Sequence, residues 1–145
     1  MISSGKQTND TFWAEGFLYN PSSKEVMLHF RDGNTNANPH KWAFFGGTSE
    51  ENETPAECFT RELHEELNIT FEPEEIIAMD SYLNEERMTM RHVFYVSRAK
   101  WDNSLFSLRE GGGFAWIPLE KVFDYDLSSK SLPDIKKFVT QIHHG

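Results

Sequence analysis

Glutamates crowd the segment from residue 47 to residue 69, at spacings that a purely structural helix has little reason to adopt. Three of them, Glu62, Glu65 and Glu66, lie close together and follow a glycine pair, Gly46–Gly47. Carboxylates at this spacing repel one another unless a positive charge neutralises them. A hard divalent cation is the natural partner, because it takes oxygen ligands and tolerates several carboxylates at once. The spacing therefore predicts a metal-dependent site.

The same segment carries the start and stop signals of a helix. Thr54 is placed to cap the first turn, and Glu57, three residues later, is placed to reach back to it. Pro55 falls at the first helical position, where its missing N–H costs nothing. Asn68 falls where the helix should stop, and asparagine tolerates the left-handed conformation that often ends a helix. The glutamates are thus expected on a short helix with defined ends.

The helix has one apolar stripe and one charged face. The stripe for the core consists of Ala56, Phe59, Leu63 and Leu67. The three glutamates fall off that stripe at spacings of three and four, so their carboxylates can converge on one point. Arg61 lies four residues from both Glu57 and Glu65, close enough to orient either. A solvated acidic face with ordinary Glu–Arg pairs is the alternative, but the spacing, the caps and the leading glycines together favour the metal site.

Around this helix the hydrophobic pattern predicts several strands and a second helix. Strands are expected over residues 11–19, 26–30, 41–45, 74–83, 91–98 and 114–117, a short helix over 119–123 and a terminal helix over 132–143. The polar stretch 31–40 is either a flap over the site or a solvated connection. Strands interrupted by one helix and closed by another indicate a single α/β domain over residues 1–145, with a mixed sheet.

Length, composition and charge narrow the possible functions. The chain has 145 residues and 14% aromatic residues, enough for one domain with a core rich in Phe and Trp. It has no apolar run that could span a bilayer and a polar N-terminus unlike a signal peptide, so we expect a cytoplasmic protein without a membrane partner. Its one cysteine, Cys58, excludes an internal disulfide and is expected to pack in the helix. The net charge of −9 argues against DNA or RNA polymers as partners.

The acidic residues are unevenly distributed. Ten of the 23 lie between residues 47 and 75. An anionic substrate can approach such a patch only with metal ions between the charges, so the charge balance and the predicted metal site support each other.

The acidic helix and its flanks resemble the Nudix box, a motif of glycines, glutamates and one arginine at fixed spacings. The chain matches the motif at Gly47, Glu53, Arg61, Glu62, Leu63, Glu65, Glu66 and Ile69. Asn68 replaces the final glycine of the motif, and asparagine is the next best residue for that backbone conformation. The box covers 23 of the 145 residues, and residues 42–47 and 114–119 are also similar to the family.

The resemblance implies a Nudix-type α/β/α sandwich in which the box forms a loop-helix-loop on a mixed sheet. It also implies a Mg²⁺-dependent hydrolase, with Mn²⁺ as a substitute, that cleaves the diphosphate of a nucleoside diphosphate linked to another group. The implied metal ligands are Glu62, Glu65, Glu66 and a backbone carbonyl of Gly46 or Gly47. Arg61 is expected to hold the glutamates in place, and Glu53 to support the loop or a second metal.

The general base and the substrate contacts are less specified. Glu66, acting through the metal, and Glu110, before the triple glycine 111–113, are the main candidates for the base; Glu85 and Glu86 are weaker ones. A loop-surface role for Glu110 is at least as well supported. Arg31 and Arg91 are candidates to bind substrate phosphate, with surface pairing as the alternative. The aromatic candidates to stack on a base are Trp13, Phe17, Phe44 and Trp116, with core packing as the alternative.

Three functions fit these features. The first is hydrolysis of a nucleoside diphosphate derivative such as a nucleotide sugar. The second is hydrolysis of a nucleoside triphosphate in a pool-cleaning role. The third is a nucleotide sensor without hydrolysis, which the intact Glu62, Glu65 and Glu66 disfavour. All three take a small nucleotide. Because members of the family often form dimers, a homodimer is one expected assembly.

Overall fold

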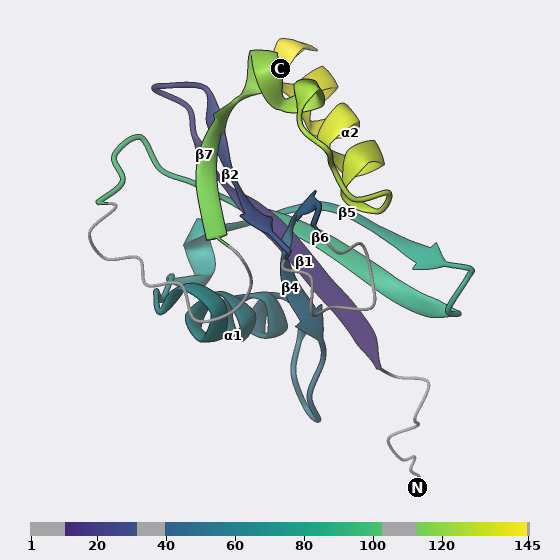
Figure 1. Ribbon diagram of the computed structural model, residues 1–145. Coiled ribbons are helices and arrows are strands. Elements are labelled where there is room, and N and C mark those ends of the chain that lie inside the picture. The colour runs from purple at the N-terminus through teal and green to yellow at the C-terminus, as the bar shows by residue number, and fades with distance from the viewer. Residues whose placement is uncertain (1–10, 32–39, 103–112, 145) are drawn as a thin grey trace, which may run out of the picture.

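The computed structural model describes residues 11–31, 40–102 and 113–144. A mixed sheet lies between two helices, α1 (Pro55–Leu67) on one face and α2 (Ser131–His144) on the other (Figure 1). The strands are β1 (Phe12–Asn20), β2 (Glu25–Phe30), β3 (Trp42–Ala43), β4 (Phe45–Thr48), β5 (Ile76–Asn84), β6 (Thr89–Ser97) and β7 (Gly113–Pro118). Two short 3₁₀ helices are present as well: η2 (Pro73–Glu75) precedes β5, and η4 (Leu119–Asp124) follows β7. The predicted α/β/α sandwich is confirmed.

The sheet is mixed because one strand pair is parallel. The strand order is β3-β2-β1-β6-β5, with β4 paired to β1 and β7 paired to β2. Strands β1 and β6 run parallel, and the other pairs run antiparallel. The central strand β1 pairs with β4 along its first half and with β2 at its end, so β4 lies where β1 and β2 separate.

Alternating residues of β1 build the two halves of the core. Ala14 and Leu18 belong to the cluster under α1, whereas Phe17 and Tyr19 belong to the cluster under α2. This is the period of two that a strand buried on both faces requires. Phe138 of α2 closes the second cluster, with its ring centroid 4.8 Å from that of Phe17 and 5.0 Å from that of Tyr19.

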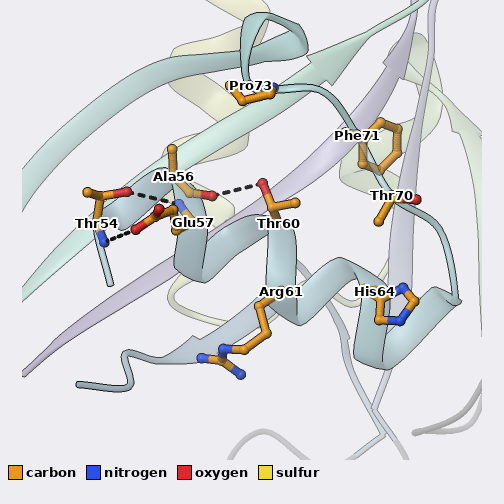
Figure 2. Close-up of a pocket in the computed structure, with 9 residues that line it drawn as sticks. All are labelled: Thr54, Ala56, Glu57, Thr60, Arg61, His64, Thr70, Phe71 and Pro73. Atoms are coloured by element: carbon orange, nitrogen blue, oxygen red, sulfur yellow. Dashed lines mark hydrogen bonds between the residues drawn. The ribbon is translucent and has the colours of Figure 1, made fainter. Parts of the chain in front are cut away.

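Helix α1 forms as its sequence predicts. The Thr54 hydroxyl accepts a hydrogen bond from the Glu57 N–H at 3.2 Å, and the Glu57 carboxylate accepts one from the Thr54 N–H at 2.8 Å (Figure 2). Asn68 ends the helix in the left-handed conformation, at φ 59°. Phe59 and Leu63 of the apolar stripe are completely buried, as is Leu67. The charged residues are therefore held on a helix that the core fixes in place.

Most strands differ by one or two residues from their predicted bounds, and for two of them the structure shows the cause. The predicted strand 41–45 is divided into β3 and β4 at Phe44, whose N–H donates to the Ser131 hydroxyl at 3.2 Å. That contact spans 87 positions of the chain, so no local pattern announces it. The predicted strand 74–83 begins later, at Ile76, because Pro73 opens a 3₁₀ turn. Gly46 and Gly47 consequently lie within β4 instead of after a strand.

Within the described residues, no helix is both long and apolar enough to cross a bilayer.

Candidate active site

The glycine pair of β4 seats two glutamates of α1. Glu66 is 5% exposed, and its Oε2 accepts a hydrogen bond from the Gly46 N–H at 2.9 Å. Glu62 packs over Gly47, where an added Cβ would lie 2.7 Å from Glu62 Oε2. Gly46 has φ +143°, and a Cβ there would lie 2.2 Å from the Ala14 carbonyl oxygen. Gly46 requires glycine because β1 approaches its backbone too closely for a side chain, whereas at Gly47 the close neighbour is the Glu62 carboxylate.

Arg61 joins the remaining carboxylates. Its guanidinium donates to Glu53 through two nitrogens, at 2.5 and 3.1 Å. The Nη1 nitrogen donates to Glu62 Oε2 at 3.1 Å and to Glu65 Oε2 at 3.0 Å. The Nη2 nitrogen also donates to the Thr48 carbonyl at 3.0 Å, which ties α1 to the end of β4. Arg61 does not pair with Glu57, because that carboxylate completes the helix cap.

The three glutamates meet only in part. Glu62 and Glu65 converge on one point, Arg61 Nη1, whereas Glu66 turns toward Gly46 and lies 3.6 Å from His29 Nδ1. Among the residues that the structure describes, no group of three or more His, Cys, Asp or Glu is arranged to hold a metal ion. The guanidinium supplies the positive charge that neighbouring carboxylates require.

The donor set nevertheless fits a hard divalent cation. Every side chain in it offers carboxylate oxygens, which is the ligand type that Mg²⁺ and Mn²⁺ prefer. The point on which Glu62 and Glu65 converge already holds a cationic nitrogen. A rotation of Glu66 away from the Gly46 N–H would add a third carboxylate from the same face of the helix.

The ion pair between Arg61 and Glu53 shifts the pKa values of both groups. Hydrogen bonds from Arg61 lower the pKa of Glu53, and the same bonds raise the pKa of Arg61. Cys58, on the neighbouring turn, is completely buried. Burial raises the pKa of its thiol to about 12, with the charge of Glu53 acting in the same direction. The thiol is therefore neutral, which agrees with a packing role and not with a nucleophile.

The lowered pKa of Glu53 predicts a specific dependence of stability on pH. A carboxylate whose pKa is lower in the folded state stabilises the fold above its unfolded pKa of about 4.5, and this contribution is lost as the pH falls through the folded value. We expect Glu53→Gln to melt at a lower temperature than the unmodified chain at pH 7, and this difference to shrink as the pH is lowered below 4.5. Thermal melts followed by circular dichroism check this.

Glu51→Gln is the matched control, because Glu51 is an exposed carboxylate of the same loop. It should melt like the unmodified chain throughout. A deficit of Glu53→Gln that is the same at pH 3 and pH 7 would contradict an ionic role.

Two residues predicted to contact substrate lie together on the α2 side of the sheet. Arg31, after β2, and Trp13, on β1, line one cavity of about 60 Å³. Two further cations, Arg87 and Lys130, line it as well. They escaped the sequence analysis because they are far apart in the chain and share no motif. A further aromatic candidate, Trp116 on β7, lies on the α1 side of the sheet. Its ring centroid is 5.4 Å from that of Trp101.

Two other candidates are buried within the fold. Phe44 is 2% exposed and packs on Phe17, with ring centroids 5.1 Å apart. Arg91 is 3% exposed, and its guanidinium donates to Glu15, Asp134 and the Tyr82 hydroxyl. Phe44 thus serves the core, as does Phe17, and Arg91 links β1, β6 and α2. None of the three is carried into the functional proposal.

The candidates for the general base are placed differently. Glu66 is in the site, as described above, whereas Glu85 and Glu86 are exposed in the turn between β5 and β6. Glu110 lies outside the described residues.

A larger cavity of about 560 Å³ borders the opposite side of α1 (Figure 2). Its walls are mainly apolar and include Ala56, Phe71 and Pro73. Arg61 contributes to its lining, but the side chain points away from Phe71 and Pro73 (Figure 2). Its guanidinium bonds to Glu53, Glu62 and Glu65 instead. The volume is in the range of small-molecule sites.

The family model of the NUDIX domain matches residues 14–141 of the chain. No match was found among curated proteins.

Several solved structures share the fold. A MutT structure from a study of the Aliivibrio salmonicida and Vibrio cholerae proteins has a TM-score of 0.74 at 22% identity and covers 90% of this chain and 98% of its own. The MutT protein of Methanosarcina mazei has a TM-score of 0.68 at 21% identity, covering 92% and 95%. The dihydroneopterin triphosphate pyrophosphohydrolase of E. coli has a TM-score of 0.69 at 18% identity, covering 90% and 95%. At these identities the likeness concerns the fold.

Proposed function

The chain belongs to the Nudix hydrolase family, whose members hydrolyse phosphoanhydride bonds of small nucleotides with the help of a divalent metal, and from this premise we propose that it cleaves the diphosphate of a nucleoside diphosphate linked to a second group. We further propose that residues 1–145 form a single domain with Mg²⁺, or Mn²⁺ in its place, as the cofactor. A nucleotide sugar is one substrate of this class.

One observation carries the proposal. Glu62 and Glu66 pack against the Gly46–Gly47 pair. Arg61 donates hydrogen bonds to Glu62 and to Glu65. With Glu66 rotated away from the Gly46 N–H, Glu62, Glu65 and Glu66 would hold the metal, with a backbone carbonyl of Gly46 or Gly47 nearby. When bound, a divalent cation neutralises the phosphate oxygens and lowers the pKa of a coordinated water.

The residues of the chain supply position and proton transfer. Arg61 orients Glu62 and Glu65, and Glu53 in turn fixes the guanidinium through two hydrogen bonds. Positioning of this kind is the main protein contribution in phosphoryl chemistry. Glu66 is our candidate for the group that takes a proton from the attacking water, and Glu110 is the second candidate.

A nucleoside triphosphate is the second candidate substrate. One of the structures that share the fold is named for a triphosphate substrate, the E. coli pyrophosphohydrolase. The nucleotide-sensor alternative has less support, because a domain that only binds does not require the three glutamates of α1.

A substrate panel tests the proposal. Purified protein with Mg²⁺ is incubated with nucleotide sugars, dinucleoside polyphosphates and nucleoside triphosphates, and the products are identified by mass spectrometry. We expect cleavage within the diphosphate of at least one nucleoside diphosphate derivative, giving a nucleoside monophosphate and a phosphorylated second group. Release of pyrophosphate from triphosphates alone would favour the second candidate. No hydrolysis of any compound, with binding retained, would support the sensor.

A further inference from the structure

The α2 side of the sheet carries a small cavity whose walls are rich in cations. It has a volume of about 60 Å³ and is lined by Trp13, Glu15, Arg31, Ala43, Arg87, Ser128, Lys130 and Ser131. A neighbouring space of about 30 Å³ shares Trp13, Glu15 and Lys130 with it and adds Arg91. Arg31, Arg87 and Lys130 therefore line the cavity of about 60 Å³. A fourth cation, Arg91, lines the neighbouring space.

These cations are brought together by the fold and not by the sequence. Arg31 follows β2, Arg87 lies in the turn between β5 and β6, and Lys130 precedes α2. The chain has only 14 Lys and Arg residues and a net charge of −9. Like charges that share a cavity repel one another, so cations gathered in a cavity of an acidic protein indicate a binding site for an anion.

The neighbouring carboxylates do not neutralise the whole cluster. Glu15 and Asp134 both pair with Arg91, which uses their charge within the fold. Among the described residues, neither Arg87 nor Lys130 has a carboxylate oxygen within 4.0 Å of its charged nitrogens.

The pKa of Lys130 agrees with this geometry. It is lowered, first by burial and then by the charges of Arg87, Arg91 and Arg31, with Glu86 acting in the opposite direction. An anion in the cavity would relieve this repulsion and gain charge-assisted hydrogen bonds.

The size of the cavity selects the kind of anion. A nucleoside needs a pocket of several hundred Å³, on the order of 300 Å³ or more. A cavity of about 60 Å³ instead matches a few water molecules or one tetrahedral anion. Guanidinium and ammonium groups are the usual protein partners of a phosphate group.

The position of the cavity relates it to the candidate active site. Trp13 and Glu15 of its wall pair in register with Thr48 and Gly46 of β4. The cavity therefore lies beside the stretch of β4 against which Glu62 and Glu66 are seated, with the sheet between them.

We propose that Arg31, Arg87 and Lys130 bind a phosphate group. This proposal does not rest on the proposed function.

Phosphate binding is measured in metal-free protein. Inorganic phosphate is titrated in excess chelator, so that the carboxylates of α1 cannot hold it through a cation, and the melting temperature is followed. We expect phosphate to raise the melting temperature of the unmodified chain. The double variant Arg87→Gln/Lys130→Gln should need about tenfold more phosphate for the same rise, because charge-assisted hydrogen bonds are lost.

The matched control is Lys121→Gln/Lys136→Gln, which removes the same charge from two exposed lysines outside the cavity. It should respond like the unmodified chain. Equal responses of both double variants, or no response of the unmodified chain, would overturn the phosphate site.

Discussion

Replacing Glu66 by glutamine is expected to lower kcat about a thousandfold while the fold stays intact. The loss follows because a metal ligand contributes several kcal/mol of charge stabilisation, and each 1.36 kcal/mol corresponds to about a tenfold change in rate. The fold should survive because an amide oxygen can still accept the hydrogen bond from the Gly46 N–H, and the amide nitrogen can face His29 Nδ1. Initial rates and thermal melts measure the two effects separately.

Glu51→Gln again supplies the control, since it removes one exposed carboxylate of the same acidic segment and lies at an unspecified position of the box. Its rate should equal that of the unmodified chain. If Glu66→Gln kept the full rate, the assignment of Glu66 as a metal ligand and base would be wrong.

Excess chelator is expected to stop hydrolysis completely, and added Mg²⁺ or Mn²⁺ to restore it. A diphosphate that approaches α1 meets a segment with ten acidic residues between positions 47 and 75. Without a cation, the charge of Arg61 is divided among Glu53, Glu62 and Glu65, so little of it is left for the substrate. Product formation is measured over a titration of metal against chelator.

Melting temperature in chelator gives the accompanying structural measurement. It should change little, because Arg61 bridges the carboxylates through its own hydrogen bonds. Full hydrolysis in excess chelator would contradict a metal-dependent mechanism, and a collapse of the fold would show that the loss of rate has a structural cause.

The parts of the site that follow from local signals could be predicted from the sequence. Helix α1, its capping residues and its apolar stripe depend on residues that are three or four positions apart, and the structure contains them as predicted. The helical spacing also predicted that Arg61 could reach Glu57 or Glu65, and in the structure it contacts Glu65. Helical periodicity fixes such relations before any tertiary contact is known.

Relations between distant residues could not be predicted in the same way. The division between β3 and β4 depends on a hydrogen bond from Phe44 to Ser131, and the burial of Arg91 depends on Asp134 of α2. The cavity formed with Arg87 and Lys130 likewise brings together five separate segments of the chain. The orientation of Glu66 depends on β4, so the helix alone could not show that it turns away from Glu62 and Glu65.

The state of Cys58 has a consequence for the chemical durability of the protein. Its thiol is enclosed beside Arg61, with a pKa of about 12, and donates a weak hydrogen bond to the Gly47 carbonyl at 3.7 Å. Oxidants and alkylating reagents attack the thiolate form, which is almost absent at neutral pH under these conditions. The only sulfhydryl of the chain therefore sits within the box helix without making that helix vulnerable to oxidative stress.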